Sequence, residues 1–471
     1  MSWAAEELKT ASLGDKRRNQ RLIKIVEDLS AMPIASVTQA ARDKAAVQGI
    51  YEFWGNVRVQ ADEILAAHRD STLSRMEGQE IVLAVQDTTE LDFTEHRKKQ
   101  GLGALSKKDA QGLKVHSVLC VSPLGVPLGV LHQKVWAREK NRRTTGHQDR
   151  KRAIEQKESH RWLESLELTQ QWISPDKKVV TVADREADIY ELFVLPRREG
   201  SEFLIRACQP RGVKQIATDL EIESLQAAIE KTAACGELTL ELQRTPKRKP
   251  RTATLTVRIS SLELQPPQQH PQRSGLKPVR VQVVWAVEEH PPSGERAIAW
   301  LLLTTLEVTC FEQASRCLRW YTYRWLIERY HYTLKSGCRL EQLQLETADR
   351  LERALATYAI VAWRLLWLTY EARSHPTESI EGILPPHYWI ALYCHIHQTT
   401  VLPEKPPSLA DCVRWIARLG GFLGRKSDGE PGVKTLWLGL QRVHDMASFW
   451  QLMANGNPGV VTAILCEEKC D

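Results

Sequence analysis

Residues 81–87 have the sequence IVLAVQD, an apolar run that ends on Asp87. Residues 179–184, VVTVAD, repeat this pattern and end on Asp184. Continuous apolar runs of this length are typical of strands that are covered on both faces. They predict the centre of a sheet with helices packed on each side of it.

The segments around these two runs predict a mixed sheet. Strand-like residues cover 113–121 and 126–136, and the sequence PLG at 123–125 predicts a turn between them. A polar helix near 157–170 and a further strand near 203–206 follow in the chain. Three strands with hairpin-like links, followed by helix, strand, helix and strand, predict an α/β fold.

Residues 208–300 interrupt this alternation with a β-rich insertion, in which 252–260 and 279–287 are strand-like. A long helix is expected over 311–335, and an apolar core helix near 349–373. The apolar stretch of this core helix is interrupted by an arginine and is shorter than the roughly 20 residues of a membrane span. We therefore expect no membrane partner. After the core helix, we expect a helical tail.

Residues 1–76 are expected to form helices, with Asp15 capping the first, Ser36 capping a second that runs to about Trp54, and Asp62 capping a third. The first helix carries a basic cluster, Lys16, Arg17, Arg18 and Arg21. Such a cluster is either a solvated helix face or a surface that binds a polyanion, and the sequence leaves both interpretations open.

The composition is that of a globular chain. Of 471 residues, 42% are hydrophobic and 26% are charged, which excludes a mostly disordered protein. The 64 basic and 58 acidic side chains give a net charge of +6, compatible with a nucleic-acid partner only if the bases cluster. The ten cysteines lack paired spacing, and the start of the chain has no signal-peptide pattern, so we expect a reducing cytoplasm.

Asp87 and Asp184 are the first candidates for chemistry. Ligands gather outside the carboxyl ends of strands in open α/β sheets, so neighbouring strands would place both carboxylates in one pocket. The alternative is that each aspartate is a turn or N-cap residue. In the helix over 311–335, a polar stripe lies opposite the apolar face. This stripe consists of Tyr321, Arg324, Glu328 and Lys335.

An isolated stripe of this kind is often a solvated face with an Arg324–Glu328 pair at i,i+4. Together with the two aspartates, however, Glu328 would complete a set of three carboxylates suited to hard divalent metals such as Mg²⁺. Two such ions about 4 Å apart support in-line displacement at a phosphodiester. Arg324 and Lys335 would then hold non-bridging phosphate oxygens.

The spacing Tyr321-x2-Arg324-x3-Glu328-x6-Lys335 resembles the YREK signature of the insertion-sequence-four family of bacterial cut-and-paste transposases. The sequence VADREADI at 182–189 resembles the second acidic motif of that family, and VQDTT at 85–89 the first. The similarity extends to SLGDKRR at 12–18, at the start of a DNA-binding helix, and to KVHSVL at 114–119, in the second strand.

The resemblance implies a ribonuclease-H-like mixed-sheet core with Asp87, Asp184 and Glu328 as the DDE ligands of two Mg²⁺ ions, for which Mn²⁺ can substitute. It implies three domains: helical and DNA-binding over 1–76, catalytic over 77–372 with the insertion at about 208–300, and helical and dimerising over 373–471. The implied partners are double-stranded DNA, both transposon ends and target, and a second copy of the chain in a synaptic complex.

Other residues are implied to bind DNA. Trp300 corresponds to the position where an indole stacks on a flipped base, although a strand tryptophan is more often a core residue. Tyr321, Arg324 and Lys335 would grip phosphates around that base, and Arg206 matches a DNA-contacting arginine. The implied reaction is a nick by metal-activated water, hairpin formation, hairpin opening and joining of the 3′-hydroxyl to target DNA.

The sequence is also compatible with two other functions. A domesticated, catalytically silent copy would bind transposon ends and repress, and a metal-dependent nuclease would cut without joining. The intact Asp87, Asp184 and Glu328 favour an active enzyme, expected in the bacterial cytoplasm at the nucleoid.

Overall fold

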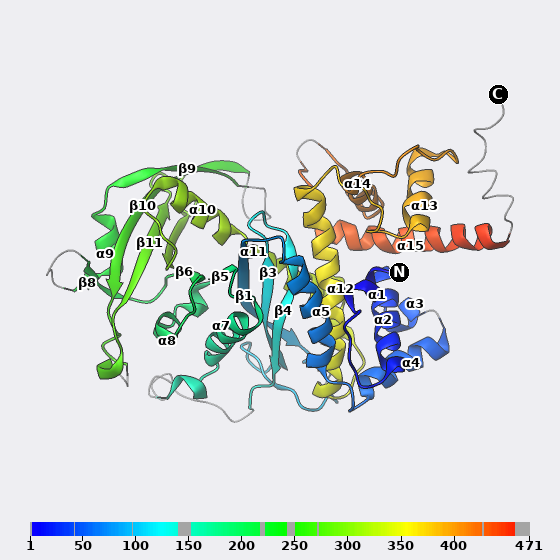
Figure 1. The fold of residues 1–471 in the computed structure, drawn as a ribbon, viewed down its shortest axis with the longest axis horizontal. Coiled ribbons are helices and arrows are strands. Elements are labelled where there is room, and N and C mark those ends of the chain that lie inside the picture. Colours follow the sequence, from blue (N-terminus) through cyan, green and yellow to red (C-terminus); the bar gives the residue numbers. More distant parts are fainter. Residues whose placement is uncertain are drawn as a thin grey trace.

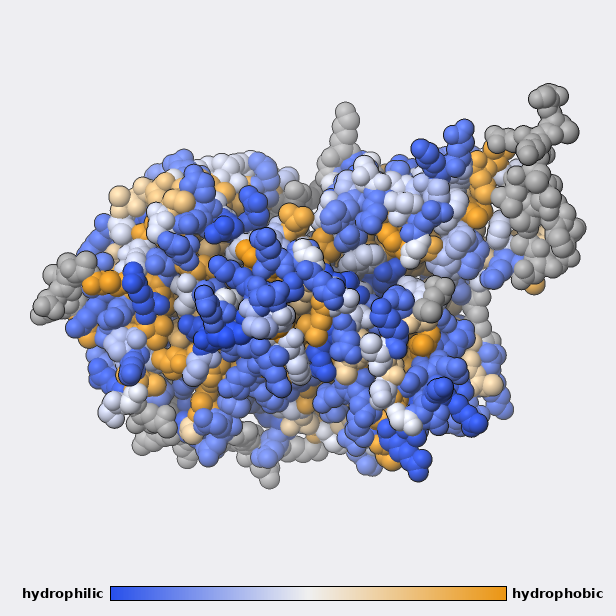
Figure 2. Space-filling view, in the orientation of Figure 1, coloured by the Kyte–Doolittle hydropathy of each residue, from blue (hydrophilic) through white to orange (hydrophobic). Residues whose placement is uncertain are grey.

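The protein has a mixed α/β architecture in which a large sheet is flanked by helices from both ends of the chain (Figure 1). The computed structural model describes residues 2–41, 43–96, 98–139, 152–216, 222–242, 250–270, 273–425 and 428–456. None of the described helices combines the length and the hydropathy of a membrane span, and hydrophilic residues predominate on the face shown in Figure 2.

The core of the sheet consists of five strands, β1 (Ile81–Asp92), β3 (Gln111–Val121), β4 (Pro127–Trp136), β5 (Lys178–Ala183) and β6 (Ser201–Arg206). Strand β1 is antiparallel to β3 and parallel to β5, and β5 is parallel to β6. The sheet is therefore mixed, as the sequence predicts. Strand β1 continues past the expected end, because its last residues still pair with β3.

The insertion extends the same sheet rather than forming a separate one. Strand β6 pairs with β12, which pairs with β11, and β11 pairs with β10. Within the described residues, twelve strands form this sheet. The remaining strands are β2 (Gly103–Ala104), β7 (Gly212–Gln215), β8 (Glu223–Ser224), β9 (Ala234–Leu242), β10 (Arg251–Leu264), β11 (Val279–Val287) and β12 (Ala299–Thr304).

Helices cover both faces of the core strands. Leu83 and Val85 of β1 belong to a core shared with α10 (Phe311–Thr322), α11 (Trp325–Tyr332) and α12 (Ala348–Ser374). On the other face of the sheet, residues of β1, β5 and β6 pack against the helices that precede and follow β5. The continuous apolar runs of β1 and β5 agree with this burial on both faces. The helices on that side are α7 (His160–Trp172) and α8 (Tyr190–Val194), with short 3₁₀ turns at Ile154–Gln156 and Arg185–Ala187.

The helix predicted over 311–335 is interrupted twice. At Tyr323 and Arg324 the backbone hydrogen bonds run from residue i to i−3, which separates α10 from α11. Thr333–Gly337 then form a π-helical turn that contains Lys335. A helical wheel for one continuous α-helix therefore does not describe the stripe. Tyr321, which the wheel places on the polar side, is only 5% exposed.

The N-terminal helices also differ in detail from the expectation. The single helix expected from Ser36 to Trp54 is two helices, the second capped by Asp43. Gln60 and Glu63, rather than Asp62, form the capping box of the last. The helices of this region are α1 (Trp3–Glu7), α2 (Lys16–Ala31), α3 (Val37–Ala41), α4 (Lys44–Gly55) and α5 (Ala61–Arg75).

Helix α12 connects the parts of the molecule. The indole of Trp54 in α4 donates to Thr357 Oγ1 (3.2 Å), and buried Arg353 donates to two backbone carbonyls beside α4. The C-terminal half of α12 packs into a separate apolar core with the last three helices (Figure 1). These are α13 (Pro386–His397), α14 (Leu409–Leu419) and α15 (Val433–Gly456).

Candidate active site

Asp87 and Asp184 occupy equivalent positions on neighbouring strands. The parallel register pairs Val85 of β1 with Val182 of β5, and each aspartate lies two residues further along its chain. Beyond this point β5 ends and β1 keeps only its antiparallel partner. The two carboxylates therefore share the carboxyl edge of these strands, the place where α/β sheets bind ligands.

Each aspartate is also held by a backbone amide. The amide of Thr88 donates to Asp87 Oδ1 at 2.7 Å, and that of Glu186 donates to Asp184 Oδ1 at 2.8 Å. Asp184 thereby caps the 3₁₀ turn that follows it, so the capping interpretation of this residue also describes its geometry. Each carboxylate keeps a second oxygen that these amide bonds do not use.

Glu328 and Arg324 come from the start of α11, which packs against β1. Nη2 of Arg324 donates to Glu328 Oε1, and Nη1 lies 3.9 Å from Asp87 Oδ2. The i,i+4 pair expected of a solvated helix face is thus present, but it faces the aspartates. Arg324 and Asp87 side chains are each only 15% exposed.

Burial and the neighbouring negative charges raise the pKa of Asp87 to about 7. Burial is the largest cause, followed by the negative charge of Asp184, and Glu328 adds to it, whereas the Thr88 amide and Arg324 oppose it. The negative charges of Asp184 and Glu328 beside Asp87 are costly without a cation. Their hard oxygen donors fit a divalent metal ion, which would offset that repulsion.

A second group of predicted residues lies together at the junction of β6, β12 and α10. The rings of Trp300 and Tyr321 meet edge to face with centroids 5.9 Å apart. Arg206 donates to the carbonyl oxygen of Ala299 at 2.7 Å, next to Trp300 in the chain. Trp300 is partly buried.

Lys335 and the N-terminal bases lie elsewhere. Lys335 Nζ donates to the carbonyl of Glu90, further along β1 than Asp87, and is 3.6 Å from Glu341 Oε1. In the basic cluster, Arg18 donates to the Leu13 carbonyl at 2.6 Å. The other three side chains of this cluster are exposed on α2, which packs against α12: Lys16, Arg17 and Arg21.

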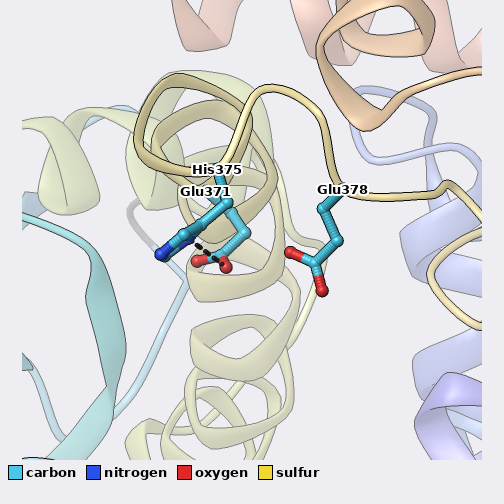
Figure 3. A group of neighbouring side chains, drawn as sticks. All are labelled: Glu371, His375 and Glu378. Atoms are coloured by element: carbon cyan, nitrogen blue, oxygen red, sulfur yellow. Dashed lines mark hydrogen bonds and ion pairs between the residues drawn. The ribbon is translucent and has the colours of Figure 1, made fainter.

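A tighter group of potential metal ligands lies at the end of α12, where Glu371, His375 and Glu378 have donor atoms within 4.8 Å of one another (Figure 3). His375 Nδ1 and Glu371 Oε1 are 2.8 Å apart, an ordinary i,i+4 contact on a helix. Within the part of the chain that the structure describes, the oxygens of Asp87, Asp184 and Glu328 do not all lie within 4.8 Å of one another.

Two polar residues beside the aspartates are not predicted from the sequence to belong to the site. Arg161 of α7 donates to Thr88 Oγ1, and His116 Nδ1 of β3 lies 2.9 Å from the same oxygen. Both are buried. His116 gives a weak signal, a polar residue inside an apolar strand, whereas Arg161 gives none, because its partners are distant in the chain.

The mixed sheet, with two aspartates after adjacent strands and a glutamate from a later helix, has the arrangement expected of a DDE phosphoryl-transfer enzyme with a ribonuclease-H-like core. The chain belongs to the Tn5-type transposases: family models match for transposase DNA-binding (residues 1–59), the transposase DDE domain (70–364) and the transposase Tn5 dimerisation domain (360–451). It is thus a DNA-binding DDE transposase that self-associates and depends on a divalent metal. The predicted fold class, enzyme class and family are confirmed.

Proposed function

We propose that this transposase works by a cut-and-paste route in which Asp87, Asp184 and Glu328 hold two Mg²⁺ ions, with Mn²⁺ able to substitute. The observation that carries the proposal is the shared position of Asp87 and Asp184 on adjacent strands, with Glu328 facing them from α11. The bound ions supply positive charge that favours a deprotonated oxygen nucleophile and stabilises the leaving oxygen.

The neighbouring bases act on the DNA backbone. Arg324 gives up its hydrogen bond with Glu328 and donates two parallel hydrogen bonds to two non-bridging oxygens of a phosphate. Lys335 attracts a phosphate of the same DNA strand as a point charge. The carboxylate of Glu328 is then free for the metal. DNA and metal therefore favour each other's binding, since a phosphate pairs with Arg324 and a metal ion pairs with Glu328 once their mutual bond is broken.

Nicking, hairpin formation, hairpin opening and joining are each in-line phosphoryl transfers that differ in the nucleophile. One site therefore serves all four steps without a covalent intermediate. Trp300 stacks on a base flipped out near the cleavage point, which requires an open indole face. Arg206 and Tyr321, which lie beside that indole, grip the adjacent phosphates.

The division of labour along the chain follows the three domains. Residues 1–76 bind the transposon end through Lys16, Arg17, Arg18 and Arg21, residues 77–372 carry out the chemistry, and residues 373–471 pair two protomers in a synaptic complex. The β insertion at about 208–300 brings Trp300 to the core, because β11 and β12 continue the core sheet.

The experiment that tests this function follows labelled ends of the element that encodes this chain, incubated with the protein, Mg²⁺ and a target plasmid. We expect nicked, hairpin, broken and joined products in that order. Cutting without joined product would identify a nuclease. Binding without any cutting would identify a repressor. Hairpins that never form would contradict the proposed route while leaving the enzyme class intact.

A further inference from the structure

All three guanidinium nitrogens of Arg161 in α7 donate hydrogen bonds beside the active site. The residue is only 9% exposed. Nε donates to Thr88 Oγ1 at 2.8 Å, and Nη2 donates to Glu186 Oε2 at 2.7 Å. Nη1 donates to the carbonyl of Glu158 at 2.8 Å, within the turn that starts α7. The planar guanidinium therefore joins β1 and the loop after β5 to one helix.

The two residues that Arg161 grips by their side chains are the ones whose backbone amides hold the aspartates. Thr88 donates its amide to Asp87, and Glu186 donates its amide to Asp184. A shift of either residue moves an amide and, with it, a carboxylate oxygen. One buried arginine thus connects the Asp87 and Asp184 segments through two side-chain hydrogen bonds.

The hydrogen bonds behind Thr88 support the same arrangement. Because Thr88 Oγ1 accepts from Arg161, its hydroxyl proton is available to His116 Nδ1, 2.9 Å away. His116 then carries its proton on Nε2, which faces Gln86 Oε1 at 3.4 Å. Burial holds the pKa of His116 well below its usual range, so the neutral ring that this chain of bonds requires is the stable form.

Arg161 is also fixed from the apolar side. Its guanidinium lies 5.3 Å from the ring of Trp162 and 5.8 Å from that of Trp136. The Trp162 ring in turn meets His116 edge to face at 4.6 Å. A side chain confined by rings and by bonds to all three nitrogens has lost its rotamer freedom, so it can transmit position as well as charge.

We propose that Arg161 is a positioning residue that clamps the Asp87 and Asp184 segments at the separation needed to bind the catalytic metal ions. The inference rests on the proposed ligand roles of these aspartates. Outer residues that orient ligands typically change metal affinity by about 10–100-fold when they are replaced. The clamp acts through Thr88 and Glu186 and does not touch the metal or the DNA.

The test measures Mn²⁺ affinity of the full chain without DNA, by electron paramagnetic resonance. Arg161→Gln removes a positive charge near the carboxylates, so charge alone would tighten Mn²⁺ binding. The clamp instead requires binding to weaken about tenfold. Arg161→Lys, which keeps the charge but has one nitrogen, should also weaken it. Unchanged or tighter binding by Arg161→Gln would overturn the proposal.

A second pair of variants avoids dependence on a folded Arg161 variant. Thr88→Val keeps the shape of the side chain but loses the oxygen that Arg161 grips, whereas Thr88→Ser keeps that oxygen. We expect weaker Mn²⁺ binding by Thr88→Val and near-normal binding by Thr88→Ser. The double variant of Arg161→Gln and Thr88→Val should bind no more weakly than Arg161→Gln, because the link that Thr88→Val breaks is already lost in Arg161→Gln. Additive losses, or equal binding by the two Thr88 variants, would contradict the clamp.

Two controls separate the possible failures. Arg353→Gln removes another arginine that is 8% exposed and bonded to the backbone, so it should lower stability without changing Mn²⁺ affinity. Asp87→Asn and Asp184→Asn should lose Mn²⁺ binding. If these two variants bind Mn²⁺ normally, the proposed ligand roles are wrong. If they lose binding while the Arg161 and Thr88 variants do not, only the clamp is wrong.

Discussion

Arg324 donates a hydrogen bond to Glu328, one turn further along α11. This guanidinium therefore neutralises a proposed metal ligand while DNA and metal are absent. The same side chain lies 3.9 Å from Asp87, so it sits between the helix and the strand that supply two of the three carboxylates. In the protein without DNA and metal, Arg324 therefore reduces the electrostatic repulsion between the carboxylates of the site.

Replacing Arg324 should separate its two roles. Arg324→Gln removes the cation that competes with metal, so Mn²⁺ should bind the DNA-free chain more tightly, by up to roughly tenfold or ~1.4 kcal/mol. DNA cleavage should nevertheless slow, since a phosphate contact is lost. Calorimetry and end cleavage measure the two effects. Arg329→Gln, an exposed arginine on the same helix, should change neither, and weaker Mn²⁺ binding by Arg324→Gln would count against a competing role.

Asp87→Asn should stabilise the metal-free chain at neutral pH. The pKa of Asp87 is raised to about 7 from 3.8, so between these values the folded state holds a proton that the unfolded state has lost. Stability of the wild type therefore falls as pH rises through this window, and Asn avoids the loss. The free energy of unfolding of Asp87→Asn should exceed that of wild type by about 1–3 kcal/mol above pH 7, and the difference should vanish near pH 4.

Thermal unfolding in chelator across this pH range measures the effect. Asp70→Asn, at an exposed position of α5, is the control and should show no such trend. A stability difference between Asp87→Asn and wild type that does not grow with pH would show that burial and the neighbouring carboxylates do not raise the pKa of Asp87.

Trp300→Ala should slow hairpin formation more than nicking. Stacking on a flipped base is worth roughly 1–3 kcal/mol and matters only when the duplex is distorted, so nicked ends should accumulate. A time course on labelled ends measures both steps, and a base-free site at the flipped nucleotide should partly rescue the variant. Trp285→Ala, on the neighbouring strand, is the matched control. Equal slowing of both steps would make Trp300 a structural residue.

The basic cluster of α2 should contribute to the salt dependence of end binding. Each lost phosphate contact flattens the log–log slope of affinity against salt by roughly 0.9. Changing Lys16, Arg17, Arg18 and Arg21 together to Ala should therefore lower both affinity and slope. A change of the exposed Arg414 and Arg418 of α14 should not. An unchanged slope in the quadruple variant would leave the cluster as a solvated face.

The sequence predicts most of the core because its signals are local. Apolar runs before Asp87 and Asp184 indicate strands covered on both faces, and the structure packs helices on each side of them. The limits of the prediction come from longer-range contacts. Strand β1 continues beyond Asp87 because β3 supplies partners, which the local pattern does not show.

The candidate site follows the same division. The stripe from Tyr321 to Lys335 is recognisable by spacing, but its geometry depends on the break at Arg324 and on the π-helical turn, which an ideal wheel ignores. Arg161 is invisible to any local pattern, since its bonds to Thr88 and Glu186 span 73 and 25 residues of the chain. Tertiary structure alone brings these groups together.

The most direct measurement of the central claim compares DNA-end cleavage by Asp87→Asn, Asp184→Asn and Glu328→Gln with wild type, in Mg²⁺, beside end binding by the same proteins. Each change removes a ligand charge with little change of shape. We expect cleavage to be abolished in all three while end binding stays nearly intact. Cleavage within about tenfold of wild type by any one of them, less than ~1.4 kcal/mol of barrier, would contradict the assignment of that residue as a metal ligand.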